Sequence, residues 1–166
     1  MRGNKAPVTK EKALDKLTTL CSRGEQCEFE LNRKMLNWGL NSSDRKEIIE
    51  YLKTNRFLDE ARYARSYAND KARFSAWGPA KIHAELMLRR ISTPSIREAL
   101  NSVEPAIWKE GLLRCASSKA RNLNLLGEES WENSQKLYRY IISRGFPSSA
   151  ASKAVTYMKK KQEENE

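Results

Sequence analysis

The side chains that most often carry out catalysis or bind metal ions are sparse in this chain. His83 is the only histidine, so a histidine-rich metal site is excluded and a serine–histidine–aspartate triad would depend on this one residue. Cys21 and Cys27 are six positions apart, wider than the spacing of a zinc-binding pair, and Cys115 is remote from both. We interpret His83 as a surface or boundary side chain and the cysteines as buried, unreactive thiols.

Phosphate-binding loops and paired acids give no better case for catalysis. The chain contains neither a Gly-x-x-x-x-Gly-Lys-Ser/Thr loop nor a Gly-x-Gly-x-x-Gly turn. The neighbouring acids Asp59 and Glu60 fit the start of a helix, where the helix dipole favours negative charge. We therefore predict that the chain is not an enzyme and has no catalytic residue, cofactor-binding residue or metal ligand.

Basic side chains in the middle of the chain are the main candidates for a binding function. Guanidinium groups can hold phosphates or carboxylates through two hydrogen bonds at once. Phe74 and Trp77 lie among these cations and could stack on bases or fill a partner's pocket, although a solvated basic face with Trp77 over the core is the alternative. The candidate binding residues are Arg62, Arg65, Lys71, Arg73, Lys81, Arg89 and Arg90.

The charge of the chain is concentrated in the same region. The 166 residues include 31 Lys and Arg against 21 Asp and Glu, a net charge of +10. Residues 53–97 carry 10 basic and 4 acidic groups, so they hold most of the excess. This distribution favours a polyanionic partner such as nucleic acid. The sparse cysteines and the lack of a long apolar segment or a secretory signal predict a cytoplasmic protein without a membrane span.

Apolar residues recur at helical spacing throughout the chain and predict an all-α fold. Residues 31–52, 82–103 and 137–158 align without gaps as two helices joined by a tight turn. Ser42, Thr93 and Ser148 occupy equivalent positions and are predicted to cap the second helix of each pair. Gly39 and Gly145 precede the turn, where a left-handed residue commonly ends a helix, while Arg90 holds that place in the middle copy. The middle turn must therefore be strained or built differently.

A further helical stretch precedes each pair, at about residues 10–22, 59–73 and 105–125. The prediction is three tandem three-helix units that pack end to end into an elongated, curved body. Their expected bounds are residues 10–55 for the first unit, 56–104 for the second and most basic unit, and 105–158 for the third. Residues 1–9 are expected to form a flexible N-terminus, and residues 159–166 a charged, frayed tail.

Several motifs in this order resemble the RecX family of regulatory proteins, which modulate the bacterial recombinase RecA. The family's first-unit pattern is similar to Arg23, Glu30-Leu31, Lys34-Met35 and Gly39-Leu40. Its second unit is similar to the segments Leu58–Ala64 and Gly78–Leu86. The resemblance covers about residues 10–158. One departure is that Arg89-Arg90-Ile91 stands where the family usually has Lys-Gly-Ile, which adds a positive charge.

The resemblance implies a non-enzymatic modulator that binds along the groove of the RecA–DNA filament. Such binding lowers ATP hydrolysis and strand exchange, and so restrains recombination, DNA repair and the SOS response. The expected partners are the RecA filament and single- or double-stranded DNA, contacted directly or through the filament. No cofactor and no membrane contact are expected, and the free protein is expected to be monomeric.

Two other functions remain open at this point. A plain DNA-binding protein of tandem three-helix modules would need a helix that reads bases in the major groove. Residues 44–52 and 95–103 mix charged with core residues and lack a concentrated base-reading face. A helical scaffold for unrelated proteins is the third possibility, and it would bind without salt sensitivity and without an effect on a recombinase.

Overall fold

The computed structural model describes residues 8–165, and within this range the chain forms nine helices and no strand. The first three helices are α1 (Lys10–Arg23), α2 (Glu28–Asn37) and α3 (Ser42–Thr54). The next three are α4 (Glu60–Ser75), α5 (Pro79–Leu88) and α6 (Thr93–Asn101). The last three are α7 (Pro105–Ala120), α8 (Ser130–Ser143) and α9 (Ser148–Glu163). No helix in the described range is long and apolar enough to cross a membrane.

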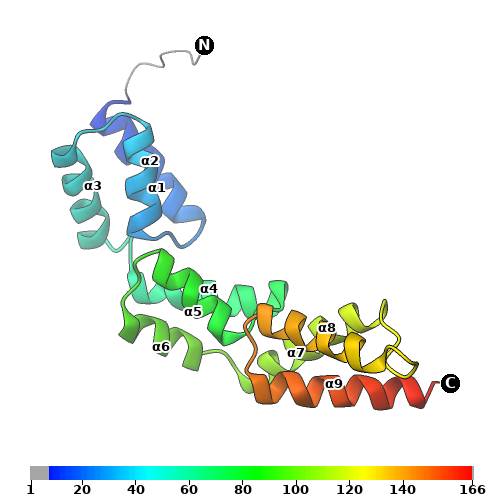
Figure 1. Ribbon diagram of the computed structural model, residues 1–166. Helices are drawn as coiled ribbons and strands as arrows, with labels where there is room; N and C mark the ends of the chain where they lie inside the picture. The colour runs from blue at the N-terminus through cyan, green and yellow to red at the C-terminus, as the bar shows by residue number, and fades with distance from the viewer. Residues whose placement is uncertain (1–7, 166) are drawn as a thin grey trace, which may run out of the picture.

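The three groups of helices follow one another along an elongated, curved body (Figure 1). The described chain starts at one end of this body, bends at α4–α6 and finishes at the other end with α9. Each group of three has its own cluster of buried apolar side chains, centred on Leu31, Ile82 and Leu137. The all-α fold of three-helix units is therefore confirmed. We call the groups α1–α3, α4–α6 and α7–α9 the first, second and third units.

The turn after the middle helix is built alike in all three units. Gly39 and Gly145 have positive φ angles of 83° and 91°, and Arg90 adopts the same left-handed conformation with φ 60°. In the second unit, the backbone N–H of Ile91 donates to the carbonyl of Leu86 at 3.1 Å. The first unit has the matching bond across its turn, also at 3.1 Å. Arg90 thus makes the turn that glycine makes elsewhere, at a conformational cost of about 1–2 kcal/mol.

The helix boundaries differ from the predicted ones in a few places. Asn41 and Ser92 are the N-caps of α3 and α6, one residue before the predicted caps, and the Asn41 side chain accepts from the Asp44 N–H at 2.9 Å. In the third unit the cap position is Pro147. Asp59 caps α4 and accepts from the Arg62 N–H at 2.8 Å. The prediction of a frayed C-terminal end was wrong for residues 159–163, which continue α9.

The second and third units are joined by backbone hydrogen bonds. The Gly78 N–H donates to the Arg144 carbonyl at 2.7 Å, and the Ala80 N–H donates to the Gly145 carbonyl at 3.1 Å. A Cβ atom on Gly78 would lie 2.4 Å from the backbone of Gly145, so the two segments touch directly. This contact fixes the start of α5, the helix that carries Lys81 and is followed directly by Arg89 and Arg90.

Candidate functional site

One face of the second unit brings basic and aromatic side chains together across α4 and α5. Tyr67 and Lys71 are four residues apart on α4 and share a helix face. Lys81, Glu85 and Arg89 repeat at the same spacing along α5. Because α4 and α5 pack against each other, these two rows lie side by side. Trp77, in the connection between the helices, completes the group.

The cations of this face lie over aromatic rings. The Lys71 ammonium is 5.4 Å from the centre of the Tyr67 ring and 5.0 Å from that of Trp77. Lys81 lies 4.7 Å from the Trp77 ring, and the Arg89 guanidinium lies 4.9 Å from the Tyr67 ring. Each distance is within the range of a cation–π interaction. We call Tyr67, Lys71, Trp77, Lys81 and Arg89 the cation–aromatic strip.

Tyr67 and Arg89 keep their ordinary charge state near neutral pH. Burial raises the pKa of Tyr67, and the nearby Arg89 only partly offsets this, so the phenol remains neutral. Burial disfavours the Arg89 cation, but its hydrogen bond to Glu85 and the neighbouring tyrosines leave its pKa above the usual value. Arg89 and Glu85 form an ion pair at 2.8 Å. The strip therefore suits binding of anions better than proton transfer.

The other predicted arginines of α4 lie on a different side of the helix. Arg62 pairs with Glu25 of the first unit at 2.6 Å, and Arg65 pairs with Glu98 of α6 at 3.0 Å. Arg73 is exposed near the C-terminal end of α4, beside Phe74, whose side chain is 80% exposed. The structure thus brings Lys71, Lys81 and Arg89 together and places the remaining α4 arginines elsewhere. Because successive residues of a helix are rotated by about 100°, the sequence already places Lys71 on a different side of α4 from those arginines.

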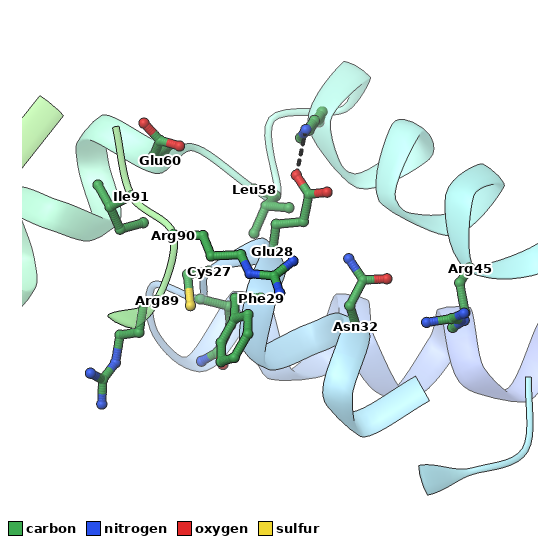
Figure 2. Close-up of a pocket in the computed structure, with 12 residues that line it drawn as sticks. Cys27, Glu28, Phe29, Asn32, Arg45, Leu58, Glu60, Arg89, Arg90 and Ile91 are labelled. Atoms are coloured by element: carbon green, nitrogen blue, oxygen red, sulfur yellow. Dashed lines mark ion pairs between the residues drawn. The ribbon is translucent and has the colours of Figure 1, made fainter. Parts of the chain in front are cut away.

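Arg90 belongs to a second basic region, a cavity between the first and second units (Figure 2). Its guanidinium lies 5.3 Å from the centre of the Phe29 ring on α2. Figure 2 shows the side chains of Arg89 and Arg90 pointing in different directions, although they are neighbours in the chain. Sequence reasoning missed Tyr67, Phe29 and Arg45 as members of these sites. For Tyr67 the signal was present as its spacing of four residues from Lys71.

The residues considered for catalysis lie apart from both basic regions or lack activation. His83 is exposed on α5, as predicted. Cys27 and Cys115 are buried and Cys21 is half-buried. Burial raises the pKa of the Cys21 and Cys115 thiols, which disfavours the reactive thiolate. Across residues 8–165, no cluster of three or more histidine, cysteine, aspartate or glutamate side chains could hold a metal ion.

Comparison with known proteins extends these observations. Residues 59–100 match the model of the second three-helix domain of RecX. The regulatory protein RecX of Clostridium botulinum (strain Eklund 17B / Type B) is 30% identical over 124 residues, which cover 75% of this chain and 58% of that protein. RecX of Haemophilus influenzae (strain PittEE) is 27% identical, with 82% of this chain and 88% of that protein covered. The chain thus spans somewhat more than half of the clostridial relative and most of the Haemophilus one.

Solved structures agree with the sequence relatives. A crystal structure of regulatory protein RecX matches 87% of this chain and 72% of its own, with a TM-score of 0.76 at 21% identity. The structure of RecX from Lactobacillus salivarius matches 90% of this chain and 96% of its own, with a TM-score of 0.73 at 17% identity. These structures share the fold. The matched second domain and the named relatives show that this chain is similar in sequence to regulatory proteins RecX.

Proposed function

We propose that this protein binds the RecA–DNA filament and lowers the ATPase and recombinase activity of RecA, and so modulates DNA repair and recombination. The observation that carries the proposal is the cation–aromatic strip, in which Lys71 and Lys81 lie over the Trp77 ring without a carboxylate partner among the described residues. The similarity of this chain to regulatory proteins RecX also supports a regulatory function.

The strip has the chemistry that a filament of protein and DNA requires. Ammonium and guanidinium groups pair with DNA phosphates and with carboxylates, and aromatic rings contribute stacking or pocket-filling contacts. The units are arranged in a line, so the strip and the flanking units can contact successive parts of a repeating partner. In this proposal Arg89 supports Lys71 and Lys81 within the strip. Arg62, Arg65, Arg73 and Arg90 lie on other parts of the second unit and make separate contacts with the filament.

In this proposal the protein acts by binding and needs neither a catalytic residue nor a cofactor. It contacts DNA directly or through the filament, is monomeric when free and works in the cytoplasm, where its partner assembles. Because phosphate contacts release counterions, its affinity for the filament weakens as salt rises.

The test is ATP hydrolysis by the cognate RecA on single-stranded DNA, with this protein titrated below one copy per recombinase. We expect inhibition in this range. A double variant, Lys71→Gln with Lys81→Gln, should weaken the inhibition by about tenfold or more, since each lost phosphate or carboxylate contact weakens a charged interface. The matched control is Lys153→Gln with Lys161→Gln, which removes the same charge from exposed positions of α9 and should inhibit normally.

Two results would contradict the proposal. Equal loss of inhibition by both double variants would make net charge, rather than the strip, responsible. No effect on hydrolysis at equimolar protein, together with tight binding to bare duplex DNA, would favour a DNA-binding protein of tandem three-helix modules instead.

A further inference from the structure

A cavity lies where the first unit meets the second, between α2 and α3 on one side and the turn after α5 on the other. Its volume is about 400 Å³, within the ~300–1,000 Å³ typical of small-molecule sites. The lining residues that matter for recognition are Gln26, Phe29, Asn32, Arg45, Lys53 and Arg90. The cavity is separate from the cation–aromatic strip, with which it shares only Arg89.

The cavity has an excess of positive charge that the chain does not neutralise. Its lining carries four cations against the two carboxylates of Glu28 and Glu60. Glu28 pairs with Lys53 at 2.6 Å, and Glu60 accepts from the Ser92 hydroxyl at 2.6 Å. Arg45 and Arg90 have no carboxylate partner within residues 8–165. The Arg45 Nε atom is buried and has no acceptor, which is a costly state for a donor in a charged group.

Arg90 is held in the cavity by a strained backbone. The other two units use glycine at this left-handed turn position, so the strain comes from having arginine there, which the turn does not require. What the conformation provides is the position of the guanidinium, 5.3 Å from the centre of the Phe29 ring (Figure 2). Arg90 is exposed, so its guanidinium is accessible to a second planar group from the solvent. Guanidinium planes stack on nucleic acid bases in this way.

We propose that this cavity binds a nucleotide. The base stacks on the open face of the Arg90 guanidinium, and the amide side chains of Gln26 and Asn32 face its hydrogen-bonding edge. The phosphate pairs with the guanidinium of Arg45, which lines the α3 side of the cavity. An acidic peptide of aspartate and glutamate fits less well, because its side chains offer no aromatic plane to the stack.

The inference goes beyond the proposed function because it needs no recombinase. The nucleotide can be free or can be one nucleotide of a DNA strand, and the recognition chemistry is the same in both cases. Loss of recombinase inhibition would leave nucleotide binding intact, and failure of nucleotide binding would leave inhibition through the strip intact.

The experiment is calorimetric titration of the full chain at low salt with deoxyadenosine monophosphate, deoxyadenosine, inorganic phosphate and a short oligodeoxyadenosine. We expect the monophosphate to bind about tenfold or more tightly than the nucleoside or phosphate alone, because base and phosphate are held together. Arg90→Gly should weaken this binding by about tenfold or more. It should keep or raise the melting temperature, because glycine makes the same turn in the first and third units without the left-handed strain.

Arg56→Gly is the matched control. Arg56 also has a φ of 60°, is exposed and lies outside the cavity, so the substitution removes the same charge and relieves the same backbone conformation. Its effect on affinity should stay within about twofold. Arg45→Gln tests the phosphate end separately and should also weaken binding.

The outcomes distinguish a free nucleotide from a nucleotide of a strand, and they test phosphate alone and an acidic peptide as alternative ligands. If the oligodeoxyadenosine binds more tightly than the monophosphate, and Arg90→Gly weakens both, the ligand is a nucleotide of a strand. Equal affinities support a free nucleotide. The proposal is overturned if phosphate alone binds as well as the monophosphate, or if Arg56→Gly and Arg90→Gly lose affinity equally. It is also overturned if the nucleotides fail to bind while a hexaglutamate peptide binds in an Arg90-dependent way.

Discussion

Individual basic side chains in the second unit differ in what already neutralises them. Arg62 and Arg65 lie in ion pairs with Glu25 and Glu98 at 2.6 and 3.0 Å. Lys71 and Lys81 instead lie over aromatic rings, which leave the ammonium groups available to a ligand. At this scale, the partner of each cation matters more for binding than the number of cations.

A hydrogen bond between Ser92 and Glu60 gives a residue-scale prediction about pH. Burial disfavours the Glu60 carboxylate, but donation from the Ser92 hydroxyl and N–H outweighs this and lowers the pKa of Glu60 below its usual value. The stability from a lowered carboxyl pKa is present above the unfolded-state pKa and is lost as pH falls through the folded-state pKa. Ser92→Ala should cost about 0.5–1.5 kcal/mol at pH 7, and the cost should shrink below about pH 4.

Urea unfolding at pH 7 and pH 3 measures this difference. Ser22→Ala is the control, because the Ser22 hydroxyl donates to the carbonyl of Thr18, which does not titrate. Its effect should be the same at both pH values. A Ser92→Ala cost that is also independent of pH would show that the hydroxyl acts without Glu60.

The strip could be predicted from the sequence only in part, and single residues show why. The spacing along α4 separates Lys71 from Arg62, and the spacing along α5 aligns Lys81 with Arg89, because a helix has a fixed geometry. The pairing of Arg62 with Glu25 joins residues 37 positions apart. No local pattern reports such a contact. The same holds for Arg90 and Phe29, which meet only when two units pack together.

Among the elements, α4 shows most directly how the sequence determines packing. Ala64, Ala68 and Ala72 recur every four residues and are buried in the second core. A row of small side chains lets α6, which packs along α4, approach closely. The position of α6 therefore depends on keeping this row free of larger groups.

Ala68→Leu tests this at the scale of the helix pair. The added side chain has no space against α6, so we expect a loss of about 1–3 kcal/mol in the free energy of unfolding. Ala84→Leu makes the same change on an exposed position of α5 and should stay within about 0.5 kcal/mol of the unchanged protein. Thermal or urea unfolding compares the two, and equal effects would mean that α4 and α6 are loosely packed.

The helical elements themselves were predicted well because their pattern repeats three times. Helix starts follow from apolar spacing and from local caps such as Asp59. Cap residues were misplaced by one position, because adjacent polar residues such as Asn41 and Ser42 both suit a cap and only the backbone geometry distinguishes them. The continuation of α9 to Glu163 was missed because a charged segment without apolar spacing gives no periodic signal.

At the scale of the whole molecule, the two joints between units differ in kind. The second and third units share the direct backbone contact of Gly78 with Gly145. Within the described residues, no backbone hydrogen bond joins the first unit to the second. Their contact consists of side chains, chiefly the Arg62–Glu25 pair and the packing of Cys27 and Phe29 on the second core. The first joint is therefore the less constrained one.

Gly78→Ala tests the tight joint. A Cβ atom there would lie 2.4 Å from backbone atoms of Gly145, which cannot move aside as a flexible side chain can. We expect a loss of about 1–3 kcal/mol in the free energy of unfolding, measured in urea. Gly24→Ala is the control, because a Cβ atom at Gly24 meets nothing within 4 Å. Equal stability of the two variants would show that the joint adapts without strain.

The joint between the first and second units should become more mobile at high salt or when its ion pair is lost. The joint between the second and third units should keep its mobility. Distances between spin labels, attached at Glu50 and Arg97 by a chemistry that spares the cysteines, report on the first joint. Labels at Arg97 and Lys153 report on the second joint, and all three positions are exposed. Arg62→Gln, or ~1 M salt with its ~3 Å Debye length, should broaden only the first distribution.

The fold itself should survive this change. The Arg62 and Glu25 side chains are 41% and 26% exposed, so their pair contributes no more than about 1 kcal/mol to stability. A broader first distribution with nearly unchanged unfolding would locate the flexibility of the molecule between the first and second units. Broadening of both distributions together, or of neither, would contradict the difference in mobility between the two joints. The nucleotide cavity lies at the joint expected to move, so its ligand should narrow the same distribution that Arg62→Gln broadens.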